Sequence, residues 1–183
     1  YLIILLGFSY FYLFIKHTVG NDSTISEWLI NYEGGFTKRG LIGQSAIEIS
    51  RIFEADLRWI ILLLQSFACT VYFFLLYNLI RKLEFNRVIV LSIFTPIFIL
   101  YPIAEIEVLA RKEILVFSLF LIYLLIPREN SFKIFSLTIF STLGILIWEP
   151  IIFYFPIIVL FEIIESKSEK FSLNLFKIIL SFI

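Results

Sequence analysis

The chain has 183 residues, of which 60% are hydrophobic, 19% aromatic and 16% charged, and its formal net charge is zero. Soluble domains average about 45–50% apolar and about 25% charged residues, so this composition excludes a water-soluble globular domain and indicates a membrane protein. The balanced charge argues against a nucleic-acid partner, and the single cysteine excludes a disulfide framework.

The sequence begins at Tyr1, contains no methionine and ends at Ile183 inside an apolar stretch. We therefore expect it to be a piece of a longer chain, truncated at both ends. Its start has neither a basic region nor a small-residue cleavage site, so the first apolar segment is not interpreted as a signal peptide.

Seven apolar segments have the length and the charged flanks that are typical of membrane helices. The apolar runs are continuous, whereas strands of a transmembrane barrel alternate in polarity at every second residue. The predicted fold class is therefore all-α: one polytopic transmembrane domain over residues 1–183. The expected spans lie at about residues 1–16, 57–80, 87–103, 107–126, 132–148, 150–165 and 171 onward.

The long connection at residues 17–56 is expected to be extracytoplasmic and to carry two interfacial helices. Residues 24–27 fit a capping box that opens a short helix reaching Tyr32. Residues 41–55 fit an amphipathic helix in the interface plane. Its apolar side would carry Ile42, Ala46, Ile49 and Phe53, and its polar side Gln44, Glu48 and Arg51.

A glycine-rich segment, residues 31–43, lies between these two helices and combines four glycines with Glu33, Lys38 and Arg39. Both cations can pair with phosphate oxygens, and a carboxylate can deprotonate an acceptor hydroxyl. Cations of this kind also stabilise a pyrophosphate leaving group. The alternative is an interfacial turn, in which Gly34 and Gly35 only make the bend and the cations meet lipid phosphates.

A second charged cluster precedes the apolar part of the fourth segment. Glu107 and Arg111 are four residues apart in the acid-first order that favours a helical ion pair. If a helix begins near Glu107, it draws Arg111 and Glu113 into the membrane edge, where ionisable groups normally face a polar cavity or a partner. The alternative is a salt-bridged helix cap at the level of the lipid headgroups.

Glu149 forms the third candidate. A single helix over residues 131–165 would be about 52 Å long, which is too long for one span. Pro150 is favoured in the first turn of a helix, so a tight helical hairpin is predicted, with Trp148 and Glu149 at its tip. Glu149 has no cation beside it in sequence, which makes Arg39 and Arg111 its candidate partners. The alternative is a helix cap next to an interfacial tryptophan.

The distribution of charge predicts the orientation. With alternating spans, the long loop, residues 104–113 and the tip at Glu149 share one face. The positive-inside rule assigns the other face, and with it the amino end, to the cytoplasm. The basic residues that we place on the cytoplasmic face are Arg81, Lys82, Arg87, Arg128, Lys133, Lys167 and Lys170.

These motifs are similar to those of bacterial polytopic membrane proteins from surface-polysaccharide gene clusters. Residues 32–43 resemble a Gly-Phe-x-x-Arg-Gly-Leu-x-Gly loop that follows the first span in those proteins, and residues 111–113 and 148–149 resemble their later motifs. The organisation also resembles C-type glycosyltransferases and O-antigen polymerases, which act on lipid-linked sugars. Unlike many C-type enzymes, the chain has no Asp-x-Asp or Asp-Glu pair after its first span. Asp22 is the nearest counterpart, and it also fits a helix cap.

The resemblance implies an integral membrane glycosyltransferase or polysaccharide polymerase at the outer face of the bacterial cytoplasmic membrane. Its expected partners are membrane lipid and a polyprenyl-phosphate-linked sugar or glycan. The expected catalytic acids are Asp22, Glu33 and Glu149. The expected phosphate-binding residues are Gly34, Gly35, Lys38, Arg39, Arg111 and Lys112. Supporting roles are expected for Glu105, Glu107, Glu113 and Trp148.

No metal site or other cofactor is identifiable, because no His/Cys/Asp cluster has ligand spacing and no nucleotide-binding motif occurs. Two alternatives to the enzyme stay open. A transporter or flippase of lipid-linked glycans would carry charged residues deep in its spans and show inverted repeats, neither of which is visible. A non-catalytic membrane protein would tolerate loss of the three charged motifs.

Overall fold

The computed structural model describes residues 1–19, 23–84, 86–95, 107–127, 132–154 and 157–158. The expected all-α class is confirmed, since these residues form helices and turns and contain no strand. The helices are α1 (Leu2–Val19), α2 (Ser23–Trp28), α3 (Leu41–Phe53), α4 (Leu57–Ile80), α5 (Arg87–Phe94), α7 (Glu113–Leu125), α8 (Phe132–Ile147) and the 3-10 helix η1 (Glu149–Tyr154).

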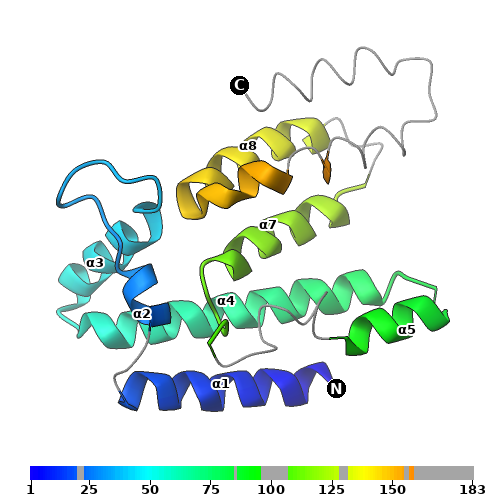
Figure 1. Ribbon diagram of the computed structural model, residues 1–183, viewed down its shortest axis with the longest axis horizontal. Helices are drawn as coiled ribbons and strands as arrows, with labels where there is room; N and C mark the ends of the chain where they lie inside the picture. The colour runs from blue at the N-terminus through cyan, green and yellow to red at the C-terminus, as the bar shows by residue number, and fades with distance from the viewer. Residues whose placement is uncertain (20–22, 85, 96–106, 128–131, 155–156, 159–183) are drawn as a thin grey trace.

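Helix α4 is the central element of the fold (Figure 1). It packs against α1 on one side and against α7 on the other, and α8 packs on the far side of α7. Helices α1 and α8 run in one direction along this stack, and α4 and α7 run in the opposite direction. Loops that are far apart in sequence are thereby gathered at the two ends of the stack.

Local signals explain where α4 begins and how it binds α1. Asp56 caps the helix, because its Oδ1 accepts a hydrogen bond from the backbone N–H of Arg58 at 2.8 Å. The buried side chain of Gln65 interrupts the apolar surface of α4, and its Oε1 lies 2.8 Å from Nε2 of His17 on α1. This buried polar contact fixes the register of the two helices.

Two apolar clusters form the core. One joins α1, α2, α3, α4 and α7 and includes Leu13, Trp28, Ala46, Ile61, Cys69 and Ile114. The other joins α7, α8 and η1 and includes Val116, Tyr123, Leu137, Ile147 and Ile151. Helix α7 contributes to both clusters, so it holds the two halves of the stack together.

The expected spans are only partly reproduced. Among the described residues, α1 and α4 are long and apolar enough to cross a membrane, whereas α7 and α8 have 13 and 16 residues. The expected span at 107–126 is shorter because residues 107–110 form turns, and helix α5 ends at Phe94. The later part of the span at 87–103, most of 150–165 and the segment from 171 lie outside the described residues. The seven-span architecture is therefore not confirmed.

The two expected interfacial helices are present with altered limits. Helix α2 ends at Trp28 and does not reach Tyr32, because the chain turns there into the glycine-rich loop. In α3, Ala46 is buried and Ile49 packs on the core, as the apolar periodicity predicts. Phe53 was expected on the same side, but it is exposed.

Candidate functional site

The glycine-rich loop between α2 and α3 has a defined backbone shape. The side chain of Asn31 accepts a hydrogen bond from the N–H of Glu33 at 2.9 Å, and the N–H of Gly35 donates to the carbonyl of Tyr32 at 3.0 Å. Gly35 has a φ of +118°, which residues with a side chain rarely adopt. These contacts turn the chain back toward α3.

Two further glycines allow the loop to pack closely. A Cβ atom on Gly43 would lie 2.0 Å from the carbonyl oxygen of Ile30, and one on Gly40 would lie 2.3 Å from the ring of Tyr32. A Cβ atom on Gly34 would meet nothing within 4 Å. The first turn of α3 therefore lies directly against the chain that leaves α2.

This packing brings Arg39 to Glu149, 110 residues away in sequence. Nη2 of Arg39 lies 3.2 Å from Oε1 of Glu149, and the two side chains are 34% and 41% exposed. A partly exposed pair of this kind contributes little to folding, about 0.2–1 kcal/mol. Its importance lies in the place where it holds the two charges, at the outer edge of the helix stack.

Lys112 joins the same site from a third segment. It is the residue before α7, its side chain is fully buried, and its Nζ donates a hydrogen bond to the backbone carbonyl of Arg39 at 2.7 Å. Burial lowers the pKa of the Lys112 amine from its usual range, and the carboxylate of Glu27 opposes this shift. Lys112 thus holds the loop backbone in place and leaves the side chain of Arg39 to meet Glu149.

Arg111 faces α2 and not Glu149. Its Nε lies 3.9 Å from Oε2 of Glu27, and both atoms are buried without a hydrogen-bond partner in the part of the chain that the structure describes. The adjacent Ala110 has a φ of +55°, and its carbonyl accepts hydrogen bonds from Nε1 of Trp28 at 2.9 Å and from Gln65. Helices α2 and α4 therefore fix the turn that presents Arg111 and Lys112.

The other charged candidates are placed differently. Glu33 pairs with Arg51 on α3, which also contacts Glu48 at 3.2 Å, so the partner of Glu33 lies on α3 and is not part of the Arg39–Glu149 pair. Glu113 is the first residue of α7 and is 9% exposed; its Oε2 has no hydrogen-bond partner among the described residues.

The remaining candidates lie at the surface or outside the described residues. Lys38 is exposed, and Glu107 is exposed in the turns before α7. Asp22 and Glu105 lie outside the part of the chain that the structure describes.

The hairpin tip positions Glu149 and Trp148. The chain reverses after α8, and the side chain of Ile151 packs over Gly144, where a Cβ atom would lie 2.8 Å from Cδ1 of Ile151. The returning segment differs from the prediction, because residues 149–154 form a 3-10 helix rather than the start of an α-helix at Pro150. The ring of Trp148 lies 6.0 Å from that of Tyr154, so the tip is braced by aromatic packing.

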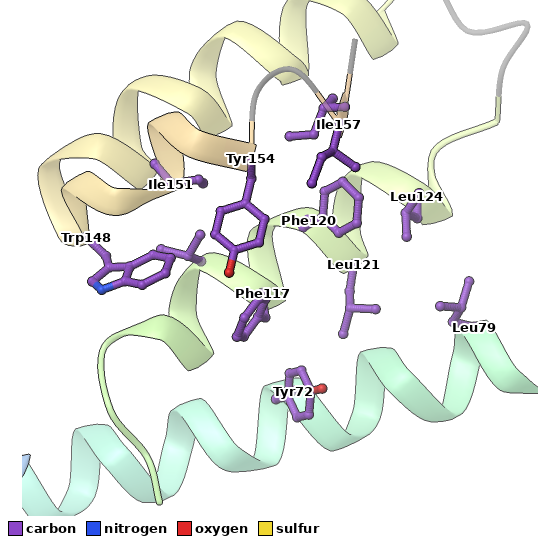
Figure 2. A pocket seen from close by; sticks show the side chains of 12 residues that line it. Tyr72, Leu79, Phe117, Phe120, Leu121, Leu124, Trp148, Ile151, Tyr154 and Ile157 are labelled. Atoms are coloured by element: carbon purple, nitrogen blue, oxygen red, sulfur yellow. The ribbon is translucent and has the colours of Figure 1, made fainter. Parts of the chain in front are cut away.

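An apolar cavity of about 390 Å³ lies next to the tip, between α4, α7 and η1 (Figure 2). All of its lining side chains are aliphatic or aromatic, and Trp148 is one of them. Periodicity along the sequence marks these side chains as apolar but does not show which of them leave space between helices. This part of the site was therefore not predicted.

The described residues offer no group of three or more His, Cys, Asp or Glu side chains that could hold a metal ion. The charges that the structure gathers are instead Arg39, Lys112 and Glu149, with Glu27 and Arg111 beside them. Of these five residues, only Glu27 was not predicted as a site residue. Its position three residues after Thr24 fits a capping box, which explains its presence without a role in the site.

Comparison of the sequence with protein-family models and with curated proteins, and of the fold with solved structures, finds no match.

Proposed function

We propose that the chain belongs to an integral membrane glycosyltransferase or polysaccharide polymerase that uses a polyprenyl-phosphate-linked sugar donor. The observation that carries the proposal is the convergence of Arg39, Lys112 and Glu149 from three separate connections. An arginine beside a carboxylate at a membrane surface supplies the two groups that such a transfer needs. The first binds phosphate, and the second accepts a proton.

The membrane assignment is part of the proposal, with seven spans and the amino end in the cytoplasm. Its support is the large number of exposed apolar side chains on α1 and α4, for example Phe8, Phe11, Leu63 and Phe67. Exposed apolar surface of this extent marks contact with a partner or with lipid. The two ends of the stack also differ, because α4 ends and α5 and α8 begin away from the proposed site (Figure 1). The basic residues at or next to these helix ends are Arg81, Lys82, Arg87 and Lys133.

The proposed reaction assigns roles to Arg39, Glu149 and Lys38. The guanidinium of Arg39 exchanges Glu149 for the donor phosphate, and its planar fork suits two phosphate oxygens. The released Glu149 takes the proton of the acceptor hydroxyl as that oxygen attacks the anomeric carbon of the sugar. The bond between the sugar and phosphate oxygen breaks, and the polyprenyl phosphate or diphosphate leaves with the electron pair. Lys38 adds positive charge near the leaving group.

The test uses the full-length protein in membranes supplied with a labelled polyprenyl-linked donor. We expect Arg39→Ala to abolish transfer while the protein still accumulates, and Arg39→Lys to be impaired as well, because lysine does not reproduce the fork. The matched control is Arg51→Ala, another arginine of the same region whose partners are Glu33 and Glu48. Normal product from Arg39→Ala, or equal loss from Arg51→Ala, would remove the proposal.

A further inference from the structure

The cavity beside the hairpin tip is lined by aliphatic and aromatic side chains. Its aromatic lining comes from α4, α7, η1 and the connection before η1, through Tyr72, Phe117, Phe120, Trp148 and Tyr154 (Figure 2). Its volume, about 390 Å³, falls in the range of small-molecule sites, about 300–1,000 Å³. A cavity with such apolar walls is suited to an apolar ligand.

One end of the cavity lies at the hairpin tip (Figure 2). Trp148 lines that end and directly precedes Glu149, which pairs with Arg39. The opposite end is lined by Leu79 and Leu124, near the last turns of α4 and α7. From Val116 to Leu124 the axis of α7 advances about 12 Å, so the apolar space leads away from the charges for that distance.

The neighbouring charges decide between possible occupants. The apolar walls begin at Trp148, the residue before Glu149, so an occupant that carries both a phosphate and a flexible hydrocarbon chain can meet the charged and the apolar surface together. An amphiphile that places its phosphate at Arg39 can therefore run one chain past Trp148 into the cavity.

We infer that this cavity binds the phosphate-proximal isoprene units of a polyprenyl phosphate, with Trp148 at the junction between head and chain. The inference rests on the proposed function and specifies where the lipid portion of the donor is held. The chain comes from lipid tails that are as apolar as the cavity, so the walls bind it by van der Waals packing, and the neighbouring arginine binds the phosphate.

The first experiment measures binding of a fluorescent polyprenyl phosphate to the full-length protein in nanodiscs. Leu79→Trp fills the cavity, and Leu63→Trp is the matched control, because it lies on the same helix but is 64% exposed and outside the cavity. We expect Leu79→Trp to weaken binding about tenfold or more, since the larger ring takes the space of the chain, and Leu63→Trp to leave it unchanged. Equal effects of the two variants would overturn the inference.

Competitors and labelling sites give a second measurement that does not depend on a substitution. Inorganic phosphate and phosphatidylglycerol should compete poorly with the probe, whereas equal competition by phosphatidylglycerol would identify a general lipid site and overturn the inference. A photoreactive group on the first isoprene unit should label wild-type peptides containing Phe120 or Tyr154. Labelling confined to α1 would contradict the inference that the chain lies in this cavity.

The two proposals fail in different ways. If sugar transfer occurs and requires Arg39 but is unaffected by Leu79→Trp, the cavity assignment is wrong and the proposed function stands. If the probe binds and Leu79→Trp blocks it, but the full-length protein transfers no sugar from any polyprenyl donor, the lipid site stands and the enzymatic function is wrong.

Discussion

At the scale of single residues, the partners of the acids distinguish their roles. Glu149 contacts Arg39, whose guanidinium can exchange it for a phosphate, whereas Glu33 is held by Arg51 on the exposed side of α3. A carboxylate that is released when the donor binds is suited to accept a proton. A carboxylate that stays paired with a surface arginine, as Glu33 does, is less suited to accept a proton.

We therefore predict that Glu149→Gln and Glu33→Gln have unequal effects on sugar transfer. Loss of the general base should lower the rate about 100-fold or more in Glu149→Gln. Glu33→Gln should retain the rate within a few-fold, because it removes only an exposed ion pair. The measurement is the initial rate of labelled-sugar transfer at equal protein levels. The opposite order would assign the base to Glu33.

The same scale shows which residue roles are visible in sequence. Arg111 and Lys112 are neighbours, and the sequence predicts phosphate binding for both. In the structure, the side chain of Arg111 reaches Glu27, whereas that of Lys112 reaches the backbone carbonyl of Arg39. The pairing of Arg39 with Glu149 was among the expected partners, because an isolated acid between two apolar arms needs a cation from elsewhere. Burial of Lys112 depends on the packing of α2, α4 and α7, which no local pattern reports.

At the scale of elements, long apolar runs with clear caps were predicted well. Helix α4 has the expected limits, and its start is marked by Asp56. Helix α7 begins six residues later than the expected span, because Trp28 and Gln65 hold the carbonyl of Ala110 in a turn with positive φ. That turn depends on tertiary contacts, so a prediction from hydrophobicity alone continues the helix through these residues.

The glycine-rich loop yields a prediction of its own. Gly43→Ala should destabilise the contact between the loop and α3 by about 1–3 kcal/mol, because the new Cβ atom meets the backbone oxygen of Ile30, which cannot move aside as a side chain can. Gly34→Ala is the control, since its Cβ atom enters open space. Thermal unfolding in detergent should show a lower midpoint for Gly43→Ala only. Equal midpoints for the two variants would mean that the close approach is not maintained.

At the scale of the whole molecule, the stack has two chemically different ends. The glycine-rich loop, the turn before α7 and the hairpin tip lie at one end, and the connection after α4 lies at the other (Figure 1). The prediction that the three charged connections meet is supported by the Arg39 and Lys112 contacts, although all of them are distant in sequence. Alternating helix directions account for this, because every second connection returns to the same end.

The proposed topology follows from these two ends and can be measured in intact cells. Lys38 and Lys82 are both exposed. Lys38 belongs to the glycine-rich loop and Lys82 to the connection after α4, and these two segments lie at opposite ends of the stack (Figure 1). The native Cys69 is buried, so a cysteine placed at either position is the reactive one among the described residues. A membrane-impermeant maleimide should label Lys38→Cys in intact cells and should label Lys82→Cys only after the membrane is opened. The positive-inside rule assigns the end with the basic connection after α4 to the cytoplasm. The reverse labelling pattern would contradict both this assignment and an outward-facing site at Arg39.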